Sequence, residues 1–109
     1  MSANVVVINI DWKSSRMHDT LDYNMRFLDR TIAGVVRNMN PSIICMCEVG
    51  ETKYPLSEKQ MLQVATRCVG AWQAVATEHI QLCTMFTTGA PYMTIYIDGP
   101  FRCSNHQIL

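Results

Sequence analysis

Three oxygen-bearing side chains, those of Asn9, Asp11 and Glu48, have the types and positions that a divalent-cation site needs. They offer one amide oxygen and two carboxylates, which are the hard donors that Mg²⁺ or Mn²⁺ prefers. Such a cation assists the cleavage of phosphate esters, because it neutralises the charge that builds up on the phosphoryl oxygens. Asn and Asp after a strand also form turns, and a Glu at a strand end is often solvated, so spacing alone leaves both interpretations open.

The elements around these residues form a strand, helix, strand unit. Residues 5–8 are all β-branched and predict a strand covered on both faces, at the centre of a mixed or parallel sheet. Apolar residues recur every three or four positions over 21–39, the period of one helical face, and 42–49 is an apolar strand that ends at a carboxylate. Parallel strands joined by a right-handed crossover share one edge at their carboxyl ends, where α/β sheets bind ligands. We therefore expect Asn9 and Glu48 to lie at neighbouring strand ends.

A second helix and a hairpin follow. Ser57 and Gln60 form a capping box for a helix over 58–68, which Gly70 is expected to end, and residues 71–76 have the pattern of a short alternating or looped connection.

Two later segments, 78–86 and 92–97, predict antiparallel strands separated by the turn residues 87–91. The fold class is α/β: a partial α/β sandwich with a mixed sheet, in which a strand-helix-strand start is followed by a helix and a hairpin. Residues 1–109 make up a single domain or part of one.

Composition limits the functional classes. Apolar residues make up 49% of the chain and charged residues 17%, which is typical of a globular protein with a buried core. Lys plus Arg equals Asp plus Glu at nine each, so net charge predicts no attraction to nucleic acid or to an anionic membrane. No apolar stretch has the length of a signal peptide or membrane span, so we expect a soluble intracellular protein with no membrane partner. The five cysteines are an odd number and favour reduced thiols.

Two segments together form a recognisable pattern: Val-Ile-Asn-Ile-Asp over 7–11 and Asn-Pro-Ser-Ile-Ile-Cys-Met-Cys-Glu-Val over 40–49. This pattern resembles that of the endonuclease/exonuclease/phosphatase superfamily of metal-dependent phosphohydrolases. In that family the first strand ends in Asn, with Asp two residues later in some branches, and the second strand follows Pro-Asp-aliphatic-aliphatic and ends in Leu-Gln-Glu. Asn9, Asp11 and Glu48 match these positions. The sequence departs from the family pattern at three positions, where Asp, Gln and Gly are usual: Ser42, Cys47 and Trp12.

The resemblance implies a role for each residue of the candidate site. Glu48 would be the main ligand of Mg²⁺ or Mn²⁺, Asp11 would assist the metal directly or through water, and Asn9 would orient the phosphate or the attacking water. The substrate would contain phosphate and could be DNA, RNA, a phosphoinositide or a small phosphate ester.

The family domain is more than twice as long as this chain, and its later Gly-Asp-x-Asn and Ser-Asp-His motifs are absent here. Residues 103–106, Cys-Ser-Asn-His, echo the last motif only by coincidence. The resemblance therefore implies the amino-terminal part of a nuclease or phosphatase domain whose carboxyl-terminal half is missing and which has no appreciable turnover alone. The alternatives are a non-catalytic α/β interaction module or degenerate fragment, and an unrelated small α+β binding domain.

Other polar residues form weaker candidate sites. Trp12 could stack on a base near the phosphate, although packing against the first helix is the commoner use of an indole. His18 lies in a polar loop that could approach a phosphate, and a solvated loop is the alternative. The loop after the second strand offers further substrate contacts, namely Glu51, Lys53 and Tyr54. Two pairs could each form half of a zinc site: Cys103 with His106, and Cys83 with His79. A surface His and a buried Cys without a metal is the favoured interpretation.

Overall fold

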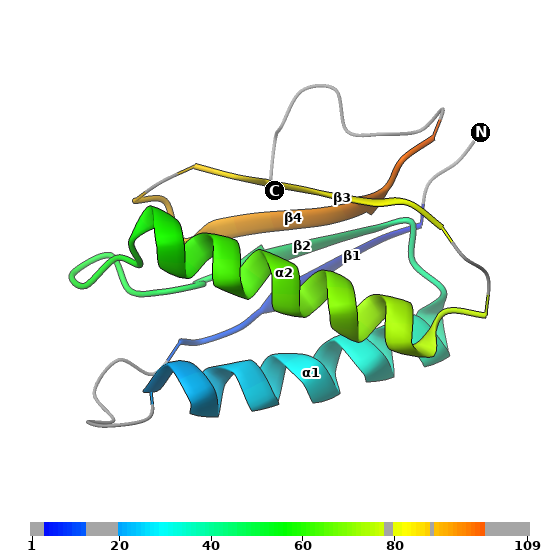
Figure 1. Ribbon diagram of the computed structural model, residues 1–109, viewed down its shortest axis with the longest axis horizontal. Helices are drawn as coiled ribbons and strands as arrows, with labels where there is room; N and C mark the ends of the chain where they lie inside the picture. Colours follow the sequence, from blue (N-terminus) through cyan, green and yellow to red (C-terminus); the bar gives the residue numbers. More distant parts are fainter. Residues whose placement is uncertain (1–3, 13–19, 78–79, 88, 100–109) are drawn as a thin grey trace.

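Two layers, a mixed sheet and a pair of helices on one of its faces, make up the part of the chain that is described (Figure 1). The computed structural model describes residues 4–12, 20–77, 80–87 and 89–99, without the side chains of 20–23. The elements in chain order are β1 (Val5–Asn9), α1 (Thr20–Met39), β2 (Ile43–Cys47), α2 (Glu58–Val75), β3 (Leu82–Phe86) and β4 (Tyr92–Ile97).

The strand order in the described sheet is β1-β2-β4-β3. β1 and β2 are parallel, with Val5 opposite Ile43 and Asn9 opposite Cys47, whereas β4 is antiparallel to both β2 and β3. The predicted strand-helix-strand unit, the hairpin and the mixed sheet are confirmed. Both α1 and α2 run in the same direction across the sheet, from left to right in Figure 1.

β1 is an edge strand among the described residues, so its predicted central position is wrong. Its β-branched residues alternate: Val6 and Ile8 are partly buried, while Val5 and Val7 are 49% and 53% exposed. A β-branched run favours the extended backbone whether or not a strand has two neighbours. β2, with β1 on one side and β4 on the other, is the more buried of the two parallel strands.

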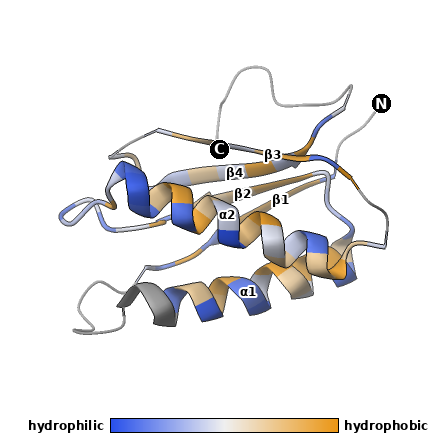
Figure 2. Ribbon diagram, in the orientation of Figure 1, coloured by the Kyte–Doolittle hydropathy of each residue, from blue (hydrophilic) through white to orange (hydrophobic). Residues whose placement is uncertain are grey.

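The core lies between the sheet and the helices. α1 contributes Leu28 and Ile32, β2 contributes Met46, and β4 contributes Ile95, all four fully buried. Figure 2 shows the same pattern, with orange apolar strands behind helices that carry blue polar residues on part of their surface. The three-and-four spacing of apolar residues in α1 therefore corresponds to its buried face, as predicted.

α2 begins at the predicted capping box and extends beyond the predicted end. The Ser57 hydroxyl accepts a hydrogen bond from the Gln60 amide at 3.2 Å, and the Gln60 side chain accepts one from the Ser57 amide at 2.9 Å. The helix does not stop at Gly70, and the predicted connection over 71–76 is instead helical as far as Val75. A glycine costs a helix about 1 kcal/mol, which the burial of Trp72 two residues later offsets.

The first strand of the hairpin is shorter than predicted, because β3 begins at Leu82 and residues 78–79 lie outside the described part. Among the described residues the four cysteines form no disulfide, which agrees with the expected thiols. Neither described helix is long and apolar enough to cross a membrane.

Candidate metal centre at the ends of β1 and β2

The carboxyl ends of β1 and β2 continue side by side beyond the strands. The Ile10 amide donates a hydrogen bond to the Cys47 carbonyl at 2.9 Å, and the Trp12 amide donates one to the Glu48 carbonyl at 3.2 Å. These bonds hold the segment 10–12 next to the end of β2. Asn9 and Glu48 therefore lie at neighbouring strand ends, and Asp11 lies between the two hydrogen bonds.

A cavity of about 250 Å³ opens at this edge of the sheet. Three carboxylate residues line it, namely Asp11, Glu48 and Glu51. The remaining wall is formed by Trp12, Gly50, Thr52 and Pro91. The structure thus brings two of the three predicted site residues, Asp11 and Glu48, to one cavity, and it adds Glu51, which the sequence suggested only as a substrate contact.

Asp11 and Glu48 share an unusual backbone conformation. Their φ angles are +52° and +57°, in the left-handed region that costs an L-residue about 1–2 kcal/mol. Asp visits this region more readily than Glu, which has no short side chain to bond to its own backbone. Strained residues of this kind persist where the surrounding structure holds them, and they cluster at functional sites. The two neighbouring ladder bonds supply that restraint here.

Gly50 closes the turn that follows Glu48. Its φ angle is +91°, and a Cβ atom there would lie 3.0 Å from Leu56 Cγ. Both the conformation and the close approach of Leu56 require glycine. The turn directs the chain back along the cavity, so that Glu51 and Thr52 reach its wall.

Asn9 acts on the backbone of the site. Its Oδ1 atom accepts a hydrogen bond from the Asp11 amide at 3.3 Å, which is an Asx turn. The described lining of the cavity does not include Asn9. Since Oδ1 is engaged, the group that Asn9 would offer to a phosphate is its Nδ2 donor.

Trp12 is only 4% exposed and belongs to the hydrophobic core, although one part of it borders the cavity. The hypothesis that an exposed Trp12 stacks on a base is therefore wrong, because the indole is buried in the core. A buried indole is large and rigid, and it fixes the segment that carries Asp11 against the core.

Pro91 is a wall residue that the sequence analysis did not select. The Val49 amide donates a hydrogen bond to the Pro91 carbonyl at 3.0 Å, at the start of β4. The signal for it is the antiparallel register, which places Tyr92 opposite Cys47. That register depends on a long-range pairing and leaves no local pattern in the sequence.

The donor set fits a cation that keeps part of its water shell. No cluster of three or more His, Cys, Asp or Glu residues arranged to hold a metal ion occurs within the described ranges. Mg²⁺, however, binds through one or two carboxylates and retains waters or takes up substrate phosphate oxygens. The side chains of Asp11 and Glu48 are exposed at the cavity and have this chemistry. The residues present therefore fit Mg²⁺ or Mn²⁺ in an open site and do not fit a closed structural zinc site.

The other candidates from the sequence lie elsewhere. Four of these residues lie outside the described part of the chain: His18, His79, Cys103 and His106. Cys83 is half-buried on β3. In the loop after β2, the Lys53 ammonium lies 5.6 Å from the centre of the exposed Tyr54 ring. This distance is that of a cation–π contact within the loop.

Compared with protein-family models, with curated proteins and with solved structures, the chain matches none of them. The class that the described structure defines is a small α/β fold with a mixed sheet and a carboxylate-lined cavity at the ends of its parallel strands.

Proposed function

We propose that the chain is the metal-binding part of a divalent-metal-dependent phosphoester hydrolase of the nuclease or phosphatase type. The observation that carries the proposal is the cavity that Asp11 and Glu48 share, each on a left-handed backbone at the end of one of two parallel strands. The likeness of 7–11 and 40–49 to the endonuclease/exonuclease/phosphatase pattern supports the same chemistry.

Each residue would have a separate task. Glu48 would be the main ligand of Mg²⁺ or Mn²⁺, and Asp11 would ligate the ion directly or through a water molecule. Asn9 holds the Asp11 amide through Oδ1 and would orient the phosphate or the attacking water through Nδ2. The bound ion would neutralise charge on the phosphoryl oxygens. The family's Gly-Asp-x-Asn and Ser-Asp-His motifs do not occur in these 109 residues, so we expect no appreciable turnover from them.

A Mg²⁺ titration of the 109-residue chain, followed by amide chemical shifts, tests this proposal. Saturable shifts should appear at residues 9–12 and 48–52. The variants Asp11→Asn and Glu48→Gln each remove one negative charge with little change in shape, and each should weaken binding by about tenfold or more, the factor that corresponds to about 1.4 kcal/mol.

Asp98→Asn is the matched control. It removes one carboxylate at the end of β4, which is the opposite end of the sheet because β4 runs antiparallel to β2. The affinity of Asp98→Asn for Mg²⁺ should equal that of the original chain. Absence of saturable shifts in the original chain, or an equal loss in all three variants, would contradict the metal site.

The second candidate function is a non-catalytic α/β interaction module. The observation that favours it is the lack, within the described ranges, of a ready cluster of three metal-ligating side chains. Such a module predicts that Mg²⁺ leaves the amide chemical shifts of the chain unchanged, so the same titration separates the two functions.

A further inference from the structure

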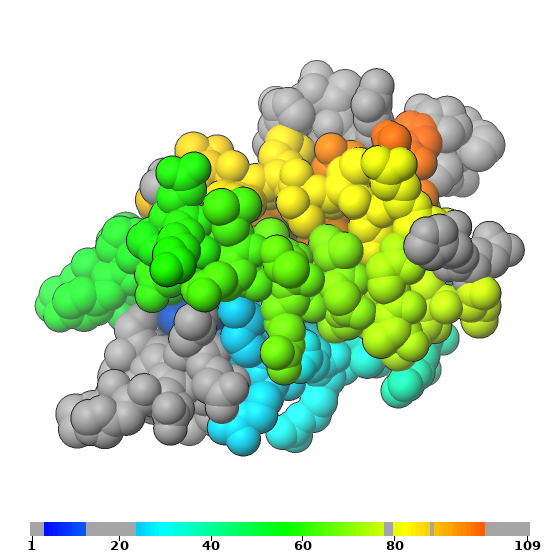
Figure 3. All heavy atoms as spheres, viewed as in Figure 1, coloured from blue at the N-terminus to red at the C-terminus, as the bar shows by residue number. Residues whose placement is uncertain are grey.

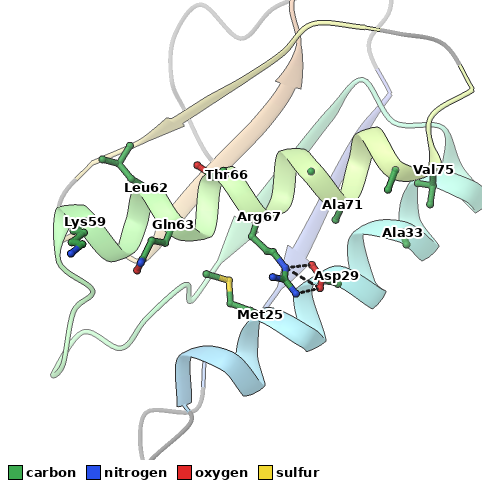
Figure 4. A pocket seen from close by; sticks show the side chains of 12 residues that line it. Met25, Asp29, Ala33, Lys59, Leu62, Gln63, Thr66, Arg67, Ala71 and Val75 are labelled. Carbon is green, nitrogen blue, oxygen red and sulfur yellow. Dashed lines mark hydrogen bonds and ion pairs between the residues drawn. The ribbon is translucent and has the colours of Figure 1, made fainter.

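A second and larger cavity, of about 910 Å³, lies on the outer surface of the two helices (Figure 4). Every residue that lines it belongs to α1 or α2, and we call it the helical groove. Met25 and Ala33 come from α1, and Leu62, Ala71 and Val75 come from α2. Figure 3 shows the side chains of α2, in green, directly alongside those of α1, in cyan, on this face of the molecule.

The helical groove is apolar where an outer helix surface is ordinarily polar. The Leu62 side chain is 52% exposed, and the small residues Ala33, Ala71 and Ala74 leave the groove shallow and open. A surface helix normally presents charged or polar residues on the side away from the core. A largely apolar groove between two helices is a type of surface that binds ligands and amphipathic helices.

The surroundings of the helical groove are basic. The chain as a whole has a net charge of zero, but the described side chains of the two helices include more cations than anions. The cations are Arg26, Arg30, Arg37, Lys59 and Arg67, and the anions are Asp29 and Glu58. The opposite sign gathers at the candidate metal centre, with Asp11, Glu48 and Glu51. Among the described residues, the helices therefore carry an excess of cations and the lining of the candidate metal centre carries only anions.

One row of cations lies on α1 beside the helical groove, although its members are not among the residues that line the groove. At 3.6 residues per turn, Arg26, Arg30 and Arg37 fall within a sector of about 40° on α1, next to the row formed by Asp29 and Ala33. The Asp29 carboxylate is already held by Arg67, whose Nη2 lies 2.7 Å from Oδ2. An incoming ligand would thus meet an apolar floor beside a positively charged rim.

We propose that the helical groove binds an amphipathic helix of a partner protein, with acidic residues flanking the apolar face of that helix. Along α2 the groove extends from Lys59 to Val75, about 24 Å at 1.5 Å per residue, which seats four turns of a bound helix. Such a helix uses apolar anchors at i, i+3, i+4 and i+7, and these contact the apolar floor. Its carboxylates face the arginine row of α1, which gives complementary charge.

The apolar floor decides between two kinds of anionic partner. A nucleic acid is held through its phosphates by a continuous basic surface, and it gains little from Leu62 or Val75. A protein helix uses the floor and the rim together. The proposed partner is for this reason an acidic amphipathic helix.

Gly70 allows the groove to be blocked without damage to the fold. It is exposed, it lines the groove, and no atom lies within 4 Å of the position that its Cβ would occupy. Gly34 on α1 has the same open surroundings but is not among the residues that line the groove. Replacing either glycine adds helix propensity, so both variants should remain folded.

The experiment titrates the 109-residue chain with two synthetic 18-residue peptides. Both carry Leu at i, i+3, i+4 and i+7 positions, and the flanking residues are Glu in one peptide and Lys in the other. The Glu peptide should shift the amide signals of 25–33 and 59–75 and bind about tenfold or more tightly than the Lys peptide. Gly70→Leu should lower the affinity for the Glu peptide by about tenfold, whereas Gly34→Leu should leave that affinity unchanged. Arg30→Glu, at an exposed site, should reverse the preference so that the Lys peptide binds more tightly.

Three results would overturn the proposal. The first is equal affinity for the two peptides, or no binding of either. The second is a dimer of the chain that Gly70→Leu dissociates, which would make a second copy the occupant. The third is tighter binding of an 18-base-pair DNA duplex or of anionic phospholipid vesicles than of the Glu peptide, with loss in Arg30→Glu and no effect of Gly70→Leu.

Discussion

The guanidinium group of Arg67 holds both carboxylate oxygens of Asp29 and so joins α2 to α1. Nε lies 2.9 Å from Oδ1 and 3.0 Å from Oδ2, and Nη2 lies 2.7 Å from Oδ2 (Figure 4). This bidentate geometry is the most specific one available to an arginine and a carboxylate. Both side chains remain in contact with solvent, at 51% and 34% exposed.

The exposure of this ion pair predicts a small contribution to stability. The variants Asp29→Asn and Arg67→Gln, combined in a double-mutant cycle, should give a coupling free energy of about 0.2–1 kcal/mol, because water and salt screen the pair. Urea unfolding at low and at high salt measures the coupling, which should decrease as salt is added. A coupling above about 3 kcal/mol, unaffected by salt, would contradict the exposed geometry.

The buried thiol of Cys68, which is influenced by the charge of Asp29, should make stability depend on pH. Burial and, to a smaller extent, the charge of Asp29 raise the pKa of the Cys68 thiol from 9.0 to about 12. In the unfolded chain the thiol loses its proton above pH 9, whereas in the folded chain it keeps the proton until about pH 12. The contribution to the free energy of unfolding is therefore complete below pH 9 and decreases between pH 9 and 12, by at most about 1.4 kcal/mol per pH unit.

Urea unfolding of the original chain and of Cys68→Ala at several pH values from 8 to 11 isolates this contribution. Lysines and tyrosines titrate in both proteins, so the difference between the two free energies reports the thiol. That difference should decrease above pH 9. A difference that stays constant over the whole range would show that the Cys68 thiol titrates at its ordinary pKa in the folded chain.

At Glu48 we expect the Gly variant to be more stable than the Ala variant. Its φ angle of +57° lies where glycine has no steric penalty and where Ala is strained. Glu48→Gly should therefore be more stable than Glu48→Ala by about 1 kcal/mol, the reverse of the order at an ordinary exposed position. Urea midpoints measure the difference, and the same pair at Glu58, in the first turn of α2, is a control that should favour Ala.

Much of the fold follows from local patterns in the sequence. The amphipathic period over 21–39, the apolar strand before Glu48 and the Ser57 capping box each combine several residues that favour the same element. The order of the parallel strands then follows from the crossover, which places Asn9 and Glu48 together without reference to any side-chain contact. Local and long-range signals agree in this half of the chain.

The features that local patterns could not predict depend on tertiary contacts. The β-branched run of β1 is compatible with an edge or a centre, because its backbone preference does not count neighbouring strands. The pattern around Gly70 resembles a helix end, whereas the burial of Trp72 two residues later continues the helix. At the candidate site, Pro91 arrives by strand pairing, and the left-handed conformation of Glu48 has no compositional signal at all.

Replacement of Thr94, in the middle of β4, by an apolar residue of similar shape should stabilise the protein. It is 1% exposed, and its Oγ1 atom has no hydrogen-bond partner within the described part of the chain. The strand register places it between Cys45 of β2 and Met85 of β3, neither of which offers a strong side-chain acceptor or donor. A buried hydroxyl without a partner costs about 1–3 kcal/mol, and Val has nearly the same shape without the hydroxyl.

Thr94→Val should accordingly raise the free energy of unfolding by about 1 kcal/mol. Thr84→Val, on the neighbouring strand β3, is the matched control, since Thr84 is half-buried and its hydroxyl is not among the buried atoms that lack a partner. The control should change stability by less than about 0.5 kcal/mol. A loss of stability in Thr94→Val would contradict the prediction, because it would mean that the hydroxyl forms a hydrogen bond in solution.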